Sequence, residues 1–307
     1  MAPFNFDATV FKPSYFPSSD VTFEPGRFWS TMRLGPHVFG VKLENHGDTD
    51  APALDLCIFS VVPPDPAAAG AVADEVRWRF DLDADLTGFS TLAAGDPLLG
   101  PAVERRRGMR LNAFQSLYEF LVITVVLQNA TVRRSVQMME NLFSGFGGRA
   151  AFDGRELSCF WEPARLAAAP EEELRALKVG YRAKTLLRQA AAFRGGGLDE
   201  RELRCLGKDE LEGRLLKVFG VGPASVGYLL FAVFHHYDAF DTVPPWEQKI
   251  YSQLLFEADL VPAATILAEV RRRWGPWRML AAHYVFEDLF GRHRQEPIPW
   301  LGKLLRL

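Results

Sequence analysis

The sequence predicts an α+β protein, with an antiparallel β-sheet module over residues 1–102 and an all-helical module over residues 103–307. Short β-rich runs separated by turn residues fill the first third, whereas apolar residues recur at helical spacing in the rest. A length of 307 residues agrees with about two domains. The charge pattern also divides the chain, because residues 1–102 carry 6 basic and 14 acidic side chains and residues 103–205 carry 17 and 12. This asymmetry favours two modules, the second with a mild preference for polyanions.

Short runs rich in β-branched and aromatic residues, bounded by Gly, Pro and Asn, predict the strands of the first module. The predicted strands cover residues 21–23, 28–32, 37–43, 53–61 and 76–80. The last of these alternates apolar and charged residues, as a half-buried strand does. The Ala/Pro-rich segment 63–73 predicts a surface loop, and residues 86–93 predict a short helix.

Apolar residues at helical spacing, joined by short Gly- or Pro-containing connections, predict the helices of the second module. These helices cover residues 117–126, 133–143, 170–177, 183–192, 209–218, 223–235, 246–255, 263–274 and 276–290.

Composition excludes several classes of protein. Cys57, Cys159 and Cys205 stand singly, which excludes a disulfide framework, a paired-cysteine zinc site and a four-cysteine iron–sulfur cluster. The first 30 residues are interrupted by charges, and the longest apolar runs are too short to span a bilayer, so we expect a cytoplasmic protein. His235 and His236 have no neighbours at metal-ligand spacing. We therefore expect no metal and no cofactor.

The segment 209–235 predicts two helices joined by a tight turn, Gly220-Val221-Gly222, with Pro223 opening the second helix. Glycine allows the positive φ that such a turn needs. Backbone N–H groups at the turn and the positive end of the second helix together suit a phosphate group. An ordinary helix–turn–helix corner would show the same pattern, so this segment alone leaves both interpretations open.

Further short motifs occur in a fixed order around this turn. They are residues 80–86 with Asp96-Pro97-Leu98, Gly108-Met109-Arg110 and Glu119; residues 126–132; residues 180–184; and residues 274–278 with 282–286. With these motifs the chain resembles, over residues 76–290, the helix-hairpin-helix DNA glycosylase superfamily. It is most similar to the bacterial 3-methyladenine DNA glycosylase II branch, with 8-oxoguanine DNA glycosylase more distant.

The resemblance implies an enzyme that flips a damaged base out of double-stranded DNA and hydrolyses its N-glycosidic bond. The expected damaged base is an alkylated purine. The resemblance also implies a carboxylate facing the sugar, near the start of the helix that follows the hairpin. The candidates are Glu247 and Asp241. Helical periodicity favours Glu247, because residues 250, 251, 254 and 255 place one apolar face on its helix. Asp241 precedes two prolines, as a turn or cap residue does.

The resemblance assigns the remaining candidates by position. Ala224 stands where bifunctional members carry a lysine, which implies a monofunctional enzyme with water as nucleophile. The implied DNA-binding residues are Gly220, Val221, Gly222, Ala224, Gln128, Asn129, Arg182 and Lys184. Gln128 and Asn129 would lie at the gap left by the flipped base; alternatively, they only cap the end of a helix. The implied base-pocket residues are Tyr228, Phe286 and Trp161.

The expected partner is double-stranded DNA with a damaged base, bound by a monomer. An oxidised-purine glycosylase and a non-catalytic relative that binds damaged DNA remain alternatives.

Overall fold

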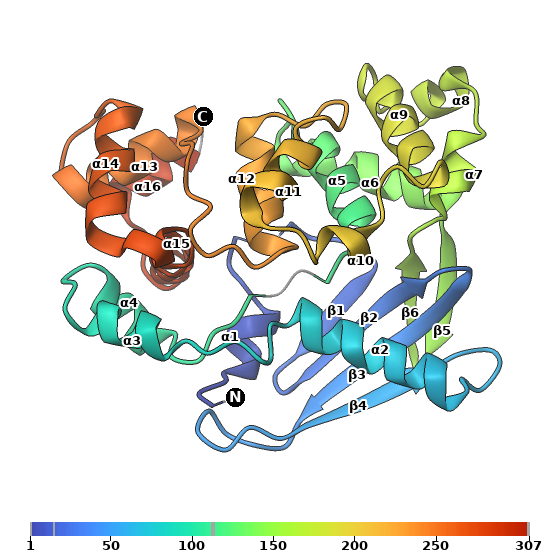
Figure 1. Ribbon diagram of the computed structural model, residues 1–307, viewed down its shortest axis with the longest axis horizontal. Coiled ribbons are helices and arrows are strands. Elements are labelled where there is room, and N and C mark those ends of the chain that lie inside the picture. Colours follow the sequence, from blue (N-terminus) through green and yellow to red (C-terminus); the bar gives the residue numbers. More distant parts are fainter. Residues whose placement is uncertain (1, 15, 112–113, 306–307) are drawn as a thin grey trace.

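The computed structural model describes residues 2–14, 16–111 and 114–305. A short helix, α1, precedes a four-stranded antiparallel sheet in which neighbouring strands follow chain order (Figure 1). Its elements are α1 (Phe6–Val10), β1 (Val21–Glu24), β2 (Arg27–Leu34), β3 (His37–Asn45) and β4 (Leu54–Phe59). Gly26 and Gly35 turn the first two hairpins at φ +75° and +57°. The first four predicted strands are therefore confirmed.

The fifth predicted strand is wrong, because residues 76–80 lie at the end of helix α2 (Pro66–Arg79), which also takes up most of the predicted loop 63–73. Asp65 caps this helix by accepting a hydrogen bond from the Ala68 N–H at 2.7 Å, and Pro66 opens it. Val72 and Val76, one turn apart, are buried against the sheet. The period-2 alternation of residues 76–80 thus falls in the last turn of a helix that buries one face, Val72, Glu75, Val76 and Arg79.

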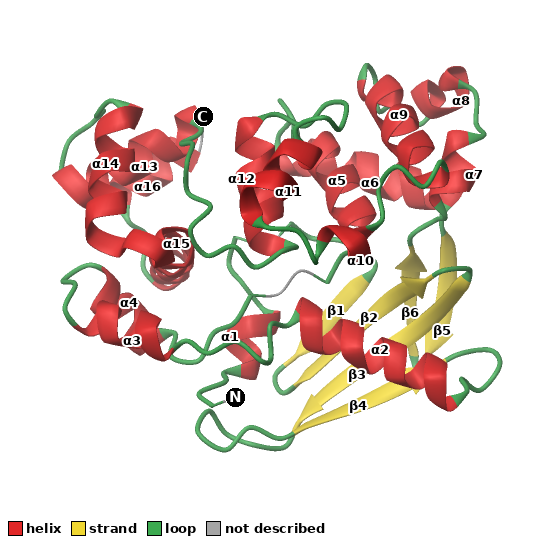
Figure 2. Ribbon diagram, in the orientation of Figure 1, coloured by secondary structure: helices red, strands yellow, loops and turns green. Residues whose placement is uncertain are grey.

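The second part of the chain is mainly helical, as Figure 2 shows. Every helix predicted there overlaps an observed one, although the last divides into a 3₁₀ turn (Gly275–Trp277) and α15. The helices are α3 (Thr87–Ala94), α4 (Leu99–Arg105), α5 (Leu117–Leu127), α6 (Val132–Phe146), α7 (Pro163–Ala167), α8 (Glu171–Ala176), α9 (Arg182–Arg194), α10 (Glu200–Leu203), α11 (Lys208–Leu215), α12 (Pro223–Ala232), α13 (Pro245–Phe256), α14 (Ala263–Trp274), α15 (Arg278–Gln295) and α16 (Pro299–Leu305).

This part is not entirely helical. A hairpin of β5 (Gly148–Phe152) and β6 (Arg155–Cys159) interrupts it, turning at Asp153-Gly154 with φ +49° and +72°. The hairpin packs on the N-terminal sheet, where the Phe152 ring lies over Gly40 so closely that a Cβ there would come within 2.6 Å of it. The Trp29 indole donates a hydrogen bond to Asp153 at 2.7 Å. The two strands were missed because they are short and lack a strong apolar alternation.

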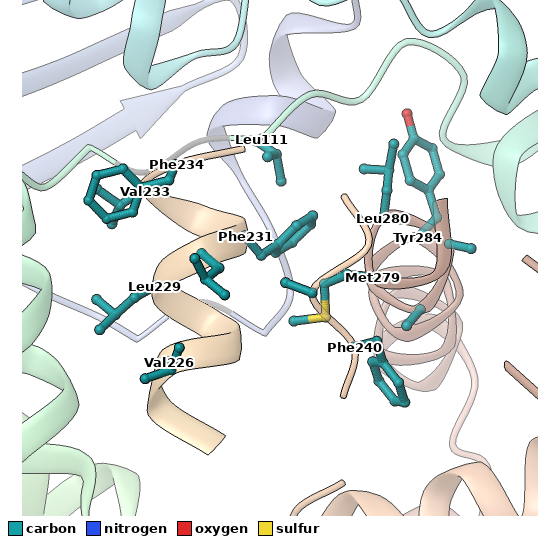
Figure 3. Packing of buried hydrophobic residues seen from close by; sticks show 14 of the residues in the cluster. Leu111, Val226, Leu229, Phe231, Val233, Phe234, Phe240, Met279, Leu280 and Tyr284 are labelled. Atoms are coloured by element: carbon teal, nitrogen blue, oxygen red, sulfur yellow. The ribbon is translucent and has the colours of Figure 1, made fainter. Parts of the chain in front are cut away.

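Three main groups of buried apolar residues hold the fold together. One lies between the sheet and α2, and a second lies among α5–α9 and includes Trp161. The third joins α3 and α4 to α11–α15. Figure 3 shows part of it, where Phe231 of α12 projects towards Met279 and Leu280 at the start of α15. Helices α12 and α15 therefore share one apolar core.

Candidate active site and DNA interface

The turn between α11 and α12 is built around a glycine that no other residue can replace without strain. Gly220 has φ +83°, and a Cβ at this position would collide with the Thr185 methyl group of α9. Gly222 differs, because its φ is −108° and nothing lies within 4 Å of where its Cβ would be. Gly222 is the N-cap of α12, with no side-chain cap, and Ala224 in the first turn is exposed. The first-turn N–H groups are therefore available to an anion.

Val221, between the two glycines, is buried and fixes the turn to the core.

The loop after α5 lies directly beside this turn. The Gln128 side-chain amide donates a hydrogen bond to the Gly220 carbonyl at 3.2 Å. Asn129 is exposed and has φ +48°, and Gln128 is the C-cap of α5. The structure therefore brings the two segments assigned to DNA binding together, and Gln128 also has the capping role that was left open.

One face of α9 supports both segments. Arg182 donates to the Val125 carbonyl at 3.1 Å and to the Gln128 carbonyl, and the Gln189 amide donates to the Phe219 carbonyl at 3.1 Å. Arg182 is only 8% exposed, so the prediction that it binds a DNA phosphate is corrected: its guanidinium is committed to backbone carbonyls. Lys184 is exposed and makes no ion pair within the described part of the chain, which leaves it free to face DNA.

Asp241 is enclosed by cations. Its carboxylate lies 3.0 Å from Arg278, 3.3 Å from Arg271 and 3.4 Å from Lys208. Partial burial alone would raise the pKa of Asp241, but the Arg278 hydrogen bond and the nearby positive charges lower it overall. The residue ties the loop before α13 to α11, α14 and α15. It is not the cap of α13, whose N-cap is Pro244, so that expectation is corrected.

Glu247 has the opposite environment. It lies in the first turn of α13, is 7% exposed, and accepts a hydrogen bond from the Tyr228 hydroxyl of α12. Burial raises the pKa of Glu247 to about 7, and the Tyr228 hydrogen bond opposes the rise. Among the described residues Tyr228 is its one hydrogen-bonding partner, and no cation pairs with it. Ile250 and Tyr251 are buried, as the predicted apolar face requires.

An exposed aromatic residue, Trp246, directly precedes Glu247 in the sequence. Trp246 is 52% exposed, and its ring meets the Phe286 ring of α15 edge-on at 5.7 Å and 78°. Phe286 in turn stacks on Phe290 at 4.5 Å. The sequence analysis named Phe286 as a base-pocket candidate and did not name Trp246, although an aromatic residue that precedes a candidate carboxylate is a usable signal for a base-binding site.

Trp161 does not belong to this group. It is buried in the core of α5–α9, against Phe143 and Phe160, and its indole N–H donates to the Tyr118 hydroxyl at 2.9 Å. Its assignment to the base pocket is therefore corrected.

The residues described contain no group of three or more candidate metal ligands. No helix within those same residues is both long enough and apolar enough to cross a membrane.

The sheet, the helical array and the glycine-containing turn together define the fold of the helix-hairpin-helix DNA glycosylases. Solved structures agree: 3-methyladenine DNA glycosylase from Archaeoglobus fulgidus superposes with a TM-score of 0.75 at 16% identity, over 97% of each chain. The Clostridium acetobutylicum 8-oxoguanine glycosylase/lyase bound to double-stranded DNA gives 0.72 at 21% identity, over 97% of this chain and 94% of that one. The resemblance expected from the sequence is confirmed.

Two curated proteins are similar in sequence. A DNA-3-methyladenine glycosylase of Bacillus subtilis is 25% identical over 215 residues, which cover 69% of this chain and 70% of that protein. A probable N-glycosylase/DNA lyase of Methanothermobacter thermautotrophicus is 24% identical over 200 residues, covering 59% and 63%. No protein-family model matches the chain.

Proposed function

We propose that this protein is a monofunctional DNA glycosylase that binds double-stranded DNA as a monomer and removes alkylated purines by hydrolysis of the N-glycosidic bond. The observation that carries the proposal is Glu247, a buried carboxylate with no cation as partner among the described residues, in the first turn of the helix that follows the α11–α12 hairpin. The similarity to a DNA-3-methyladenine glycosylase supports the substrate class.

Each part of the site has a role in this reaction. The N–H groups at the start of α12 hold a DNA phosphate, and Gln128 and Asn129 lie at the gap in the duplex. A purine alkylated on a ring nitrogen is cationic, so it gains from contact with the faces of Trp246 and Phe286. Glu247 stabilises the positive charge that develops on the sugar as the base leaves, and orients the attacking water.

Side-by-side variants of the two carboxylates test the proposal. In single-turnover excision on a methylated-purine duplex, Glu247→Gln should lower the rate by about a hundredfold or more, because one preorganised electrostatic group is lost. Its DNA affinity should remain, since a carboxylate near phosphates repels them. Asp241→Asn should keep the rate and lose about 1 kcal/mol of stability or less, because its ion pairs are partly exposed. A dead Asp241→Asn with an active Glu247→Gln would refute the assignment.

The absence of a lyase step is a separate prediction. A lyase of this type needs an amine that forms a Schiff base with the sugar, and α12 contains no lysine, with Ala224 at the relevant position. Borohydride added during turnover should therefore trap no covalent protein–DNA complex. A trapped complex would favour the second candidate function, an oxidised-purine glycosylase with lyase activity. The structural similarity to an 8-oxoguanine glycosylase/lyase is the reason for considering this candidate.

A panel of duplexes containing 7-methylguanine, 3-methyladenine or 8-oxoguanine, followed by alkali, separates these candidates. Abasic sites from the methylated duplexes alone support the proposal. Tight binding to damaged duplexes without any abasic sites would instead support a non-catalytic DNA-binding protein.

A further inference from the structure

Tyr228 and Glu247 come from different helices and meet as a closed pair. Tyr228 lies in the second turn of α12 and Glu247 in the first turn of α13, and the phenol donates its hydrogen bond to one carboxylate oxygen, Oε1. The other oxygen, Oε2, has no hydrogen-bonding partner among the described residues. One oxygen is thus fixed and the other is left for a reacting group.

The surroundings make this single hydrogen bond decisive. Within the part of the chain that the structure describes, no charged side chain acts on Glu247, and Tyr251, buried one turn further along α13, is the second titratable group that faces it. Among the described residues the Tyr228 hydroxyl is the one side-chain group that orients the carboxylate, and it adds to the positive end of α13 in favouring the charged form. Burial and the negative charge of Glu247 raise the pKa of Tyr228 well above its ordinary value, so the phenol keeps its proton and remains the donor.

We propose that Tyr228 is a positioning residue that fixes the Glu247 carboxylate by one oxygen and favours its ionised form, so that the other oxygen faces the sugar. This inference rests on the proposed function for its catalytic consequence. It adds that Tyr228 acts through Glu247, whereas position alone had suggested contact with the damaged base.

The test compares Tyr228→Phe with Tyr251→Phe. Both variants remove only a hydroxyl from a tyrosine that faces Glu247, but Tyr251 makes no hydrogen bond to it. Two quantities are measured for each protein: the single-turnover excision rate against pH on a 7-methylguanine duplex, and the ionisation midpoint of Glu247 from its infrared carboxyl band, assigned by its loss in Glu247→Gln.

Because the hydrogen bond lowers the pKa of Glu247, its removal must move the midpoint upward. Tyr228→Phe should raise the midpoint by about one to two pH units, the size expected for a hydrogen bond to a charged group. Because the wild-type midpoint is about 7, the excision rate at pH 7 should fall by about fivefold for a rise of one pH unit and by about fiftyfold for a rise of two, and it should recover towards pH 9. Tyr251→Phe should leave the midpoint and the pH profile within a few tenths of a pH unit of those of the wild type.

A second replacement makes an opposite prediction and does not depend on the folding of Tyr228→Phe. 3-Fluorotyrosine at position 228 is a stronger hydrogen-bond donor, so it should move the Glu247 midpoint downward. An unchanged midpoint with both replacements, or an equal change in Tyr251→Phe, would overturn the role of Tyr228.

The outcome is separable from that of the proposed function. If the wild-type protein excises no lesion at any pH, the proposed function fails, while the infrared midpoints still decide whether Tyr228 controls Glu247. If the wild type is active and the pH profile of Tyr228→Phe coincides with its own, the function stands and this inference fails.

Discussion

Two carboxylates six residues apart have opposite environments, and that difference indicates their roles. Asp241 is 43% exposed at its side chain and lies beside three cations, so its charge is already compensated. Glu247 is buried with a phenol as its one partner among the described residues, so its charge is available to stabilise a developing cation. Proximity to the hairpin alone does not distinguish the two residues, whereas their partners do.

An uncompensated buried carboxylate should cost stability. The folded-state pKa of Glu247 is raised from 4.5 to about 7, so the folded protein binds this proton more tightly than the unfolded chain does. The resulting stability is fully present below about pH 4.5 and is lost as the pH rises through about 7. Glu247→Gln, which keeps an acceptor for Tyr228, should therefore be more stable than wild type at pH 8, by up to about 3 kcal/mol.

Urea unfolding at pH 8 and pH 4.5 measures this difference. The advantage of Glu247→Gln should disappear at the lower pH, where the wild-type residue is protonated. The comparison cancels the contributions of the other buried acids, Asp20, Glu119 and Glu287, whose pKa values burial also raises. Equal stabilities at both pH values would show that Glu247 is solvated in the free protein.

At the level of elements, the N-terminus of α12 has no capping side chain. Gly222 occupies the N-cap position with an extended backbone conformation that any residue adopts, and its Cβ position is open. A capping side chain would satisfy the first-turn N–H groups in the free protein, but it would occupy the place proposed for a DNA phosphate.

Gly222→Asp and Gly222→Asn separate the two effects. Both side chains cap helices well, so both variants should match or exceed the wild-type stability by a few tenths of a kcal/mol. The added negative charge of Asp should weaken binding to undamaged and damaged duplexes alike, by about tenfold or more at low salt, and Asn should weaken it less. Fluorescence anisotropy over a salt series gives both affinities. Wild-type affinity in Gly222→Asp would mean that this turn does not contact DNA.

Most elements could be predicted because local signals mark their ends. Gly220 and Pro223 delimit the turn before α12, and α14 has the predicted bounds because apolar residues repeat along it up to Trp274. The failures involve tertiary contacts. The last residues of α2 have the sequence pattern of a strand, but they form a helix because one face of it packs on the sheet. The β5–β6 hairpin has a weak local pattern and is held by the packing of Phe152 over Gly40.

The same distinction applies to the site. The hairpin residues, Glu247 and Phe286 were named as candidates from the order of motifs along the chain and the family resemblance, and their roles stay predictions. The partners of Arg182, Asp241 and Glu247 come from other elements, up to 57 residues away, and no local pattern specifies them.

For the whole molecule, the packing of α3 and α4 determines where its parts divide. Both helices precede residue 106, yet their buried residues join the core of α11–α15 and not that of the sheet. Arg105 at the end of α4 binds Asp288 of α15 through two nitrogens, at 2.7 and 2.8 Å, and Arg106 donates to the Glu287 carbonyl at 2.6 Å. We therefore propose that the sheet module ends near residue 86 and that α3 and α4 belong to the helical module.

The sheet module is also tied to the helices by polar contacts. Glu75 of α2 receives two hydrogen bonds from Arg204, at 2.8 and 2.9 Å, and the Trp78 indole donates to the Val233 carbonyl at 3.1 Å. Asp81, directly after α2, accepts from the Tyr237 hydroxyl at 2.5 Å. These contacts join α2 and a residue just after it to the chain before α11 and after α12, so they oppose independent opening of the sheet module.

Leu99→Ala and Leu43→Ala test the division at residue 86. Leu99 of α4 is fully buried in the helical core, and Leu43 of β3 is 1% exposed in the sheet core. Each substitution leaves a cavity and should cost about 2–5 kcal/mol of stability. Hydrogen exchange of the backbone amides should, however, report different local openings. Leu99→Ala should accelerate exchange in α15, against which α4 packs, and leave β2 and β3 protected.

Leu43→Ala is the matched control, because it makes the same change in side-chain volume on the other side of the proposed boundary. It should accelerate exchange in β2 and β3 and leave α15 protected. A boundary at residue 102 predicts a different pattern, in which both substitutions loosen the sheet and neither loosens α15. A faster exchange rate in all elements of both variants would mean that the molecule opens only as a whole. The contacts of Glu75, Trp78 and Asp81 would then couple the two modules into one cooperative unit.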